Sequence, residues 1–345
     1  MQEPILFVGV GSIGSNALSL LKGFQKIAKE TQLLDTRYFD SPPKFSIRRV
    51  SRKVLPAAYE QFASAIIGLR IAYVSKKLKP GLVFVFKGNY VSAKTLGRIT
   101  ATKAHYHPDD STNPINRSRT FNHSEVEYDL HFTSKRHNIS EISERTGKEC
   151  HFIWYAYDPD WHFRIKDWPN SKKSYDLGFI GHYRPDRSGL ILDLSKELGK
   201  RFAIAGSNWH RTKGLSSIAT VLPPHYGVNF SRLCAEAPFQ LGLLNSDNRD
   251  LHTARSFEVP ATGALLIAEN TSDHRELFEH MSSALLFETP QELRDLLHWI
   301  DLNPSQAQAI AVRGYELITS TQNSWVDRAR EILTQIELSQ KLKGI

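Results

Sequence analysis

The chain has 345 residues and a formal net charge of +8; 41% of its residues are hydrophobic and 23% are charged. This length exceeds one typical core, so we expect two domains, and the composition is that of a globular protein. No run of about 18 apolar residues occurs that would predict a membrane-spanning helix, and no zinc-finger, RRM or KH signature accompanies the positive charge. A dedicated nucleic-acid binder is therefore not expected.

The first residues, MQEPILFVGV, lack the basic start and cleavage site of a signal peptide. Cys150 and Cys234 lie far apart and have no metal-ligand spacing. We therefore expect a cytoplasmic protein with reduced, buried thiols. The cationic cluster at residues 48–53 is typical of a solvated basic surface, although an anionic partner is the alternative.

Residues 5–10 predict a strand that runs through a G-x-G-x-x-G turn, Gly9 to Gly14, into a helix. Asp35 follows about where a dinucleotide fold needs a ribose-binding acid. Taken alone, this pattern predicts a nicotinamide or flavin cofactor. Glycines are also needed wherever a strand turns tightly into a helix, so the pattern leaves both interpretations open.

Residues 57–77 predict a long helix, and the buried strand at residues 82–86 follows it. Lys87 and Gly88 come directly after this strand. Ligands of open α/β sheets collect at such carboxyl ends, which makes both residues candidates for a ligand contact. The alternative is that Lys87 is a solvated loop lysine.

Residues 100–106 predict the next strand, which ends in a histidine- and aspartate-rich loop. A histidine or carboxylate at this edge could take a proton from a hydroxyl group, so His107, Asp109 and Asp110 are candidate general bases. A metal site is under-determined, because no further ligand has recognisable spacing. The alternative is a turn and a helix cap formed by the loop itself.

Strands are predicted at residues 128–133 and 151–155, with a helix between them. The repeated strand–helix order favours a parallel sheet with right-handed crossovers. Residues 158–174 contain two prolines and two tryptophans without a clear period, and we interpret them as the interdomain linker.

A second strand–helix series begins with a strand at residues 175–181, followed by Arg184, Arg187 and a helix over 188–198. Arginine side chains beside a helix N-terminus suit a diphosphate, whereas exposed capping arginines are the alternative. Further strands are predicted at 201–205, near 221 and at 239–244. Tyr226 could stack on a nucleotide base or pack in the core.

Residues 252–278 predict a short helix, a buried parallel strand at 264–268 and a second helix. We expect Ser256 to cap the first helix, Pro260 to lie near its first turn, and Gly263 to end it with a positive φ. Three helices complete the chain at residues 290–299, 304–319 and 324–342.

The pattern R-x-F-E-x-P-A-x-G from Arg255 to Gly263, together with G-F-I-G-x-Y-R-x-D-R over residues 178–187, resembles the donor-binding half of GT-B glycosyltransferases. The resemblance is strongest to the group related to the spore maturation protein CgeB. The strand end at residues 106–110 and the S-W-V-D-R at 324–328 resemble the same group. It implies an α/β GT-B fold: two Rossmann-like βα domains face a cleft, and the C-terminal helix crosses back to the first. The expected boundaries are 1–165, 166–325 and 326–345.

The resemblance implies a metal-independent, hexosyltransferase-like enzyme without a cofactor, which moves a sugar from a nucleotide-diphosphate sugar to an acceptor hydroxyl. Glu258 would hold the ribose, whereas Asp250 departs from the glutamate that many GT-B enzymes carry eight residues earlier. The implied donor-binding residues are Arg184, Arg187, Tyr226, Asn245, Arg249, Arg255, Glu258 and Gly263. The implied catalytic candidates are His107, Asp109 and Asp110, and the cleft or acceptor residues are Gly11, Ser12, Lys87 and Gly88.

The acceptor would be a glycan, a lipid-linked group or another hydroxyl, and the basic surface leaves a peripheral contact with the inner face of the membrane open. Two alternatives compete with glycosyl transfer. One is an NAD(P)-dependent oxidoreductase that uses the turn at Gly9–Gly14. The other is a noncatalytic protein that binds a nucleotide sugar or a glycan.

Overall fold

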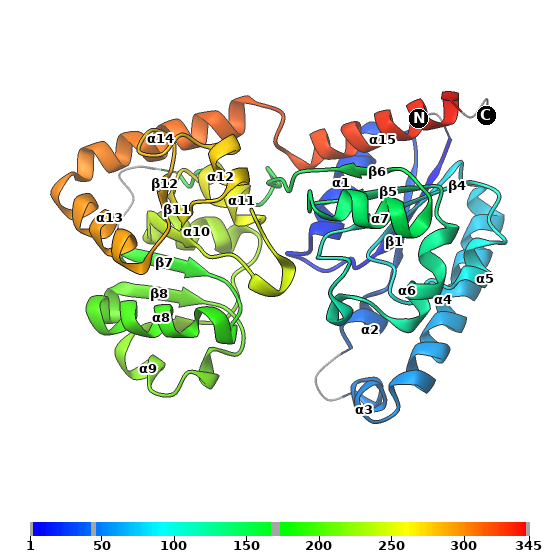
Figure 1. Ribbon diagram of the computed structural model, residues 1–345, viewed down its shortest axis with the longest axis horizontal. Coiled ribbons are helices and arrows are strands. Elements are labelled where there is room, and N and C mark those ends of the chain that lie inside the picture. Colours follow the sequence, from blue (N-terminus) through cyan, green and yellow to red (C-terminus); the bar gives the residue numbers. More distant parts are fainter. Residues whose placement is uncertain (1–2, 43–45, 167–172, 343–345) are drawn as a thin grey trace. The chain divides into compact units, whose positions relative to one another are not determined.

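The computed structural model describes residues 3–42, 46–166 and 173–342 (Figure 1). It divides into two compact units. The N-unit consists of Met1–Trp154 and Trp325–Ile345, and the C-unit consists of Tyr155–Ser324. None of the helices among the described residues is long and apolar enough to cross a membrane.

The N-unit is built on a six-stranded parallel sheet with the order β2-β1-β3-β4-β5-β6. Its strands read as continuous apolar runs, such as Leu-Val-Phe-Val-Phe in β3, because helices cover both faces of a parallel sheet. The bounds are β1 Ile5–Gly9, β2 Thr31–Asp35, β3 Leu82–Phe86, β4 Thr102–His107, β5 Leu130–Thr133 and β6 Cys150–Phe152.

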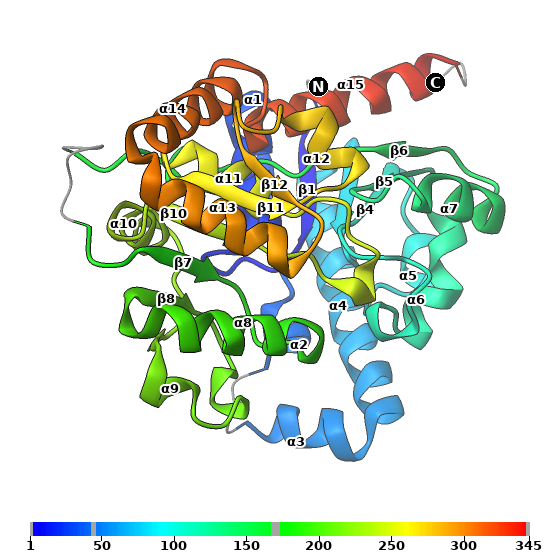
Figure 2. The same cartoon turned by 60° about the vertical axis from the view of Figure 1, so that its left-hand side comes forward.

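The helices of the N-unit include the last helix of the chain, α15, which packs beside α1 (Figures 1 and 2). A Cβ on Gly23 of α1 would lie 2.4 Å from the carbonyl oxygen of Trp325, so only glycine permits this approach. The bounds are α1 Asn16–Ile27, α2 Arg37–Asp40, α3 Ile47–Val54, α4 Pro56–Leu78, α5 Ala93–Leu96, α6 Arg119–Ser124, α7 Asn138–Thr146 and α15 Trp325–Leu342, with 3-10 turns at Pro114–Asn116 and Glu125–Glu127.

The C-unit repeats this architecture with a second six-stranded parallel sheet, in the order β12-β11-β10-β7-β8-β9. The strands are β7 Leu177–Ile180, β8 Phe202–Ala205, β9 Thr220–Leu222, β10 Phe239–Gly242, β11 Leu265–Glu269 and β12 Leu285–Phe287. The helices are α8 Pro185–Leu198, α9 Leu215–Ile218, α10 Val228–Glu236, α11 Arg255–Ala261, α12 Ser272–Leu277, α13 Pro290–Leu302 and α14 Pro304–Ser320, with 3-10 turns at Gly199–Arg201, Trp209–Arg211 and Ser246–Asn248.

The division between the units falls after Trp154, earlier than the expected boundary at residue 165. The reason is that residues 155–166 bond to the C-unit. The Ser231 hydroxyl donates to the carbonyl of Trp161 and accepts from the N–H of Phe163, and the N–H of Tyr157 donates to the carbonyl of Asn323. Residues 167–172 of the expected linker lie outside the described residues.

The stretch around α11 corrects two expectations. Ser256 is not the N-cap, because α11 begins at Arg255; its hydroxyl instead accepts from the N–H of Thr253. Pro260 stands near the end of the helix rather than in its first turn. Gly263 follows the helix with a φ of 83°, as expected, and β11 is a buried parallel strand. Cys150 and Cys234 are both free and buried, as predicted for the two thiols.

Candidate functional site

Three arginines gather at the carboxyl end of the C-unit sheet. Arg184 and Arg187 stand at the start of α8, just beyond β7, and Arg255 opens α11. The Nε of Arg255 donates to the carbonyl of Ile180, the last residue of β7, at 2.9 Å, and an Nη of Arg187 donates to the carbonyl of His182 at 2.7 Å. These bonds fix both guanidinium groups beside the same strand end.

The pKa of His182 reflects the positive charge of this cluster. Burial lowers the pKa of its imidazole, and the positive charges of Arg255, Arg187 and Arg184 lower it further. All three guanidinium groups therefore act on one side chain. Such a concentration of positive charge favours an anion.

Of the three arginines, Arg187 has no carboxylate within ion-pair distance in the described part of the chain. Its Nε is buried and has no hydrogen-bond partner there, and its guanidinium lies 5.2 Å from the centre of the Phe179 ring. Burial lowers the pKa of Arg187 to about 10, with the charge of Arg184 as the next contribution. A buried polar donor that is not bonded is costly, so this position is suited to an incoming acceptor atom.

The other two arginines already contact carboxylates. Arg184 pairs with Asp247 and Arg255 pairs with Glu258. Asp247 is exposed, whereas Glu258 is buried, with only 6% of its surface exposed. An anionic ligand could compete with the exposed pair more readily than with the buried one, because water already screens the exposed pair.

Glu258 is held from two sides. Arg255 contacts its Oε2, and the Nε2 of His162 lies 3.7 Å from its Oε1. The N–H of Asp158 donates to Nδ1 of His162, so the proton of a neutral ring is on Nε2 and faces Glu258. Sequence reasoning missed His162, because its only signal was a histidine within an aperiodic segment.

The loop from Asn245 to Asp250 is tied down at both ends. The Asn245 side-chain amide donates to Asp250 at 2.9 Å, and the Ser246 hydroxyl donates to Asp186 in the first turn of α8 at 2.5 Å. Arg249 is exposed and has a φ of 47°. The loop therefore lies beyond β10, and Ser246 joins it to the start of α8.

The remaining predicted donor residues lie on neighbouring connections of the C-unit. Tyr226 is 41% exposed on the loop between β9 and α10. Gly263 lies in the turn between α11 and β11. Tyr226 thus has the accessible ring that stacking requires, whereas Gly263 has a conformational role in the turn.

In the N-unit, Lys87 and Asp109 come together from two strand ends. The Nζ of Lys87 lies 2.6 Å from Oδ2 of Asp109, and the two side chains are 36% and 23% exposed. Burial would raise the pKa of Asp109, but the charges of Lys87 and His107 lower it overall. Asp109 is therefore an ionised, partly accessible carboxylate. Lys87 and Gly88 both have a positive φ, at 68° and 70°, which turns the chain sharply after β3.

His107 and Asp110 are much less accessible than the sequence suggested. His107 is fully buried, and its Nδ1 donates to the carbonyl of Asp109 at 2.8 Å. Its Nε2 is buried without a hydrogen-bond partner in the described structure, and burial lowers the pKa of the ring. Asp110 is 2% exposed and accepts hydrogen bonds from Thr112 and Asn138. Both side chains therefore have structural contacts.

Two further histidines adjoin His107 in the sheet. His105 and His131 are fully buried, with their Nδ1 atoms 3.2 Å apart. Burial lowers the pKa of His131 to about 4 and that of His105 well below its usual value. These rings are neutral core side chains at neutral pH.

The glycine-rich turn after β1 has a structural explanation. The N–H of Gly11 donates to Oδ1 of Asp35 at 3.1 Å, and a Cβ on Gly11 would lie 2.7 Å from Leu33. Asp35 also accepts from the N–H of Arg37 and pairs with its Nε. Ser12 accepts through its carbonyl from Ser15, the N-cap of α1. Asp35, the candidate ribose acid of a dinucleotide site, is therefore already bonded within the turn.

One cluster has the residue types of a metal site. Ligand atoms of Asp110, His137 and Glu141 lie within 4.8 Å of one another. The side-chain amide of Asn138 donates to both carboxylates, at 3.1 Å and 2.6 Å. This amide already separates the two negative charges, so their proximity does not require a cation.

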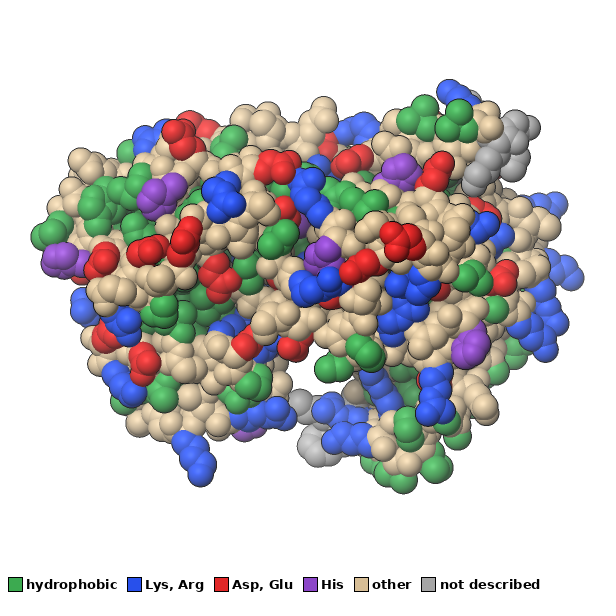
Figure 3. Space-filling view, viewed as in Figure 1, with side chains coloured by type: hydrophobic (Ala, Val, Ile, Leu, Met, Phe, Trp, Pro, Cys, Tyr) green, Lys and Arg blue, Asp and Glu red, His purple; other side chains and the backbone are tan. Residues whose placement is uncertain are grey.

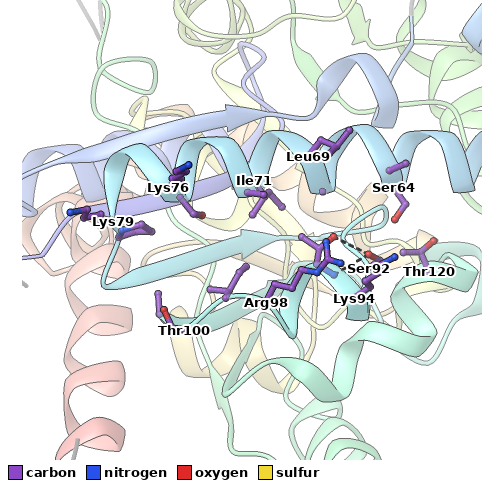
Figure 4. Close-up of a pocket in the computed structure, with 18 of the residues that line it drawn as sticks. Ser64, Leu69, Ile71, Lys76, Lys79, Ser92, Lys94, Arg98, Thr100 and Thr120 are labelled. Carbon is purple, nitrogen blue, oxygen red and sulfur yellow. Dashed lines mark hydrogen bonds between the residues drawn. The ribbon is translucent and has the colours of Figure 1, made fainter.

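A cavity of about 940 Å³ lies elsewhere in the N-unit, along α4 (Figure 4). Apolar side chains such as Leu69 and Ile71 line it, and Lys76, Lys79, Lys94 and Arg98 stand around it. None of the predicted site residues contributes to its lining.

Comparisons with known proteins agree on the architecture. Residues 187–334 match a family described as glycosyl transferase-like, whereas no curated protein matches the chain. Sucrose-phosphate synthase from Thermosynechococcus elongatus is 12% identical, with a TM-score of 0.66 over 99% of this chain and 100% of that one. Anabaena HepE in complex with UDP and glucose is 13% identical, with a TM-score of 0.65 over 97% and 100%.

UDP-GlcNAc 2-epimerase from Neisseria meningitidis, bound to UDP-GlcNAc, is 12% identical, with a TM-score of 0.54 over 96% and 99% of the two chains. These similarities establish the fold. The chain is an α/β protein of the GT-B class, with two six-stranded parallel sheets.

Proposed function

We propose that this protein is a glycosyltransferase that moves a sugar from a nucleotide-diphosphate sugar to an acceptor hydroxyl. The observation that carries the proposal is the cluster of Arg184, Arg187 and Arg255, in which Arg187 is half-buried, has a buried Nε and lacks a carboxylate partner within ion-pair distance among the described residues. The family match over residues 187–334, which includes Arg187 and Arg255, supports the same reaction class. HepE, with UDP and glucose bound, supports a nucleotide-sugar donor.

The three arginines suit the leaving diphosphate. As the glycosidic bond breaks, negative charge develops on the diphosphate, and fixed guanidinium groups stabilise that charge without reorganising. The start of α8 adds backbone N–H groups and the positive end of a helix dipole. This arrangement provides from side chains the charge compensation that a divalent cation provides elsewhere, so we propose a metal-independent reaction.

The other donor contacts follow from their positions around this cluster. We propose that Glu258 accepts hydrogen bonds from the ribose hydroxyls, with Arg255 and His162 holding its carboxylate in place. Tyr226 would stack on the base, and Asn245 and Arg249 would contact the donor from the loop beyond β10. Gly263 would support this side by shaping the turn behind Glu258.

We propose that the N-unit supplies the acceptor contacts from Gly11, Ser12, Lys87 and Gly88. Asp109 is the most accessible of the three proposed catalytic groups. His107 and Asp110, which are buried, would position it: His107 donates to the Asp109 carbonyl, and Asp110 orders the following turn. If the reaction inverts the anomeric centre, Asp109 is the proposed base. If it retains the configuration, the leaving phosphate can take the proton instead.

The motif from Arg255 to Gly263 supports membership of the CgeB-related group within this class. A glycan, a lipid-linked group or another hydroxyl remains the proposed acceptor, and the proposed location is the cytoplasm with a peripheral membrane contact. The bonds of Asp35 to Gly11 and Arg37 argue against the oxidoreductase alternative, since they occupy the carboxylate that would bind a ribose.

A thermal-shift series with nucleoside diphosphates, nucleotide sugars and NAD(P) tests the donor site. A ligand that binds the folded state raises the melting temperature. We expect stabilisation by at least one nucleoside diphosphate, and its loss in Arg187→Ala. Arg232→Ala is the matched control, because Arg232 is an exposed arginine of the same unit. No stabilisation by any nucleoside diphosphate, or stabilisation by NAD(P) alone, would contradict the proposal.

Product analysis then separates transfer from two other outcomes. The same fold occurs in UDP-GlcNAc 2-epimerase, so donor binding by itself does not establish transfer. Incubation of the stabilising nucleotide sugar with candidate acceptors should release the nucleoside diphosphate and yield a glycosylated product. An epimerised donor would contradict transfer, and binding without turnover would favour the noncatalytic alternative.

A further inference from the structure

Helix α3 of the N-unit carries apolar side chains that point to solvent. Ile47, Val50 and Val54 are 86%, 60% and 68% exposed, and Leu55, which follows the helix, is 62% exposed. The spacing of the three helical residues places them on one face. A helix on a globular protein normally buries such a face against the core, but no residue of α3 is buried.

Cationic side chains, rather than apolar ones, attach α3 to the protein. The guanidinium of Arg48 lies 5.3 Å from the centre of the Phe39 ring. An Nη of Arg52 donates to the carbonyl of Asp40 at 2.6 Å. These contacts turn the arginine face of α3 toward α2 and leave the apolar face outward. The intramolecular packing therefore does not account for the apolar residues.

The neighbouring helix α4 also carries exposed apolar side chains. Phe62, Leu69 and Tyr73 are 53%, 69% and 61% exposed, and their spacing places them on one face of α4. Leu69 also lines the cavity along α4, where Lys76 and Arg98 stand close by (Figure 4). Exposed apolar side chains of α4 therefore also have cations nearby.

The charge of α3 itself is entirely positive. Arg48, Arg49, Arg52 and Lys53 occupy four of its eight positions, and the helix contains no acidic residue. Figure 3 shows Lys and Arg side chains beside hydrophobic ones at the lower tip of the N-unit, where Figure 1 places α3. This combination is complementary to a surface that is negatively charged outside and apolar beneath.

We propose that α3 and the exposed stripe of α4 form a docking surface for an anionic lipid bilayer. Ile47, Val50 and Val54 enter the boundary between headgroups and acyl chains, while Arg49 and Lys53 bind the lipid phosphates. A nucleic acid would use outward cations and leave the apolar residues without a role. This surface lies outside the arginine cluster of the C-unit and does not depend on the proposed glycosyl transfer.

Co-sedimentation with vesicles tests the proposal. The full chain is mixed with vesicles of phosphatidylcholine alone, or of phosphatidylcholine with phosphatidylglycerol. We expect binding to the second kind only. Val50→Asp/Val54→Asp should reduce the bound fraction about tenfold or more, because the inserted apolar area is lost. The matched control is Ile115→Asp/Leu302→Asp, which places the same charges at two other exposed apolar positions and should leave binding unchanged.

A second variant tests the headgroup contacts. Arg49→Gln/Lys53→Gln should weaken binding to phosphatidylglycerol vesicles about twentyfold, since each basic residue near an anionic surface contributes a several-fold gain. Its control is Lys213→Gln/Arg232→Gln, two exposed cations of the C-unit. Because all these side chains are exposed, each variant should keep the wild-type melting temperature, which is checked first.

Three results would overturn the proposal. The first is absence of binding to both kinds of vesicle. The second is binding to anionic vesicles that Val50→Asp/Val54→Asp leaves unchanged, which would indicate charge attraction without insertion. The third is a dimer, detected by light scattering, that this variant disrupts; the apolar face would then serve a second copy of the chain.

Discussion

Each unit withdraws a charged side chain from water, Glu125 fully and Arg187 in part, and the two charges are compensated in opposite ways. In the N-unit, Glu125 is 1% exposed and contacts two arginines, Arg117 at 2.8 Å and Arg145 at 2.7 Å. Despite its burial, these partners lower the pKa of Glu125 to about 2. In the C-unit, Arg187 has no carboxylate within ion-pair distance in the described ranges, and burial lowers its pKa to about 10.

This contrast distinguishes a structural charge from a charge that is available to a ligand. A compensated ion network contributes to the fold only while all its members are present. A partly buried cation without a carboxylate partner makes the free protein less stable, and an anionic ligand recovers that free energy on binding. Removal of Glu125 is therefore expected to lower stability. Removal of Arg187 is expected to lower ligand affinity without lowering stability.

The largest expected effect is the loss of Glu125. Glu125→Ala should lower the free energy of unfolding by about 3–5 kcal/mol, because it leaves two arginines beside a buried site without their partner. Denaturant unfolding measures this change, with Glu127→Ala as the control, since Glu127 makes no such network. An equal, small effect of both variants would show that Arg117 and Arg145 find other partners.

Acid should weaken the same network. The folded-state pKa of Glu125 lies below the ordinary 4.5, so its contribution is present above about pH 4.5 and is lost as the pH falls toward 2. The shift corresponds to about 3 kcal/mol. Unfolding measured between pH 6 and pH 3 should show this loss in the wild type and a flatter profile in Glu125→Gln. Parallel profiles would contradict it.

Arg187→Met should separate binding from stability. Nucleoside diphosphate affinity should fall about thirtyfold, since a charge-assisted hydrogen bond contributes about 2 kcal/mol. The melting temperature of the free protein should stay the same or rise, because an apolar side chain of similar length replaces a poorly compensated charge. Calorimetry gives both quantities. A lower melting temperature together with unchanged affinity would reverse the assigned role.

The smallest expected effect concerns Lys87 and Asp109. Both side chains are partly exposed, so Asp109→Asn should change the free energy of unfolding by less than about 1 kcal/mol. If Asp109 serves the acceptor, turnover should fall with donor affinity unchanged. Lys87→Met gives the matched removal of the other partner. A large loss of stability in either variant would place this pair among the structural networks.

The repeating βα order and the parallel sheets were predictable, because apolar periodicity and turn residues determine them locally, whereas the return of the last helix was implied only by the resemblance to GT-B chains. The arginine cluster was also partly predictable, since Arg184 and Arg187 follow a strand and open a helix. The accessibility of the candidate catalytic residues was not predictable. His107 and Asp110 occupy a polar stretch of the sequence, yet both are buried. His107 is the last residue of β4 and packs on the ring of Phe121, and hydrogen bonds with Thr112 and Asn138 hold Asp110 inward.

The sequence around α11 also predicted the wrong N-cap, and the sequence around His162 did not indicate its contact with Glu258. Ser256 has the residue type of an N-cap, but its hydroxyl bonds to Thr253 and to the ring of His274, which comes from a later helix. His162 reaches Glu258 from a segment almost a hundred residues earlier in the chain. Contacts between distant segments depend on tertiary packing, and a single sequence carries little signal for them.

The packing of α15 on α1 affects the order in which the chain can fold during synthesis. The C-unit is one continuous segment, Tyr155–Ser324, whereas the N-unit needs both of its separated segments. The segment of the C-unit therefore emerges from the ribosome before the last helix of the N-unit does. Until then, the surface of α1 around Gly23 lacks its cover, so the nascent N-unit keeps apolar surface exposed for longer than the C-unit does.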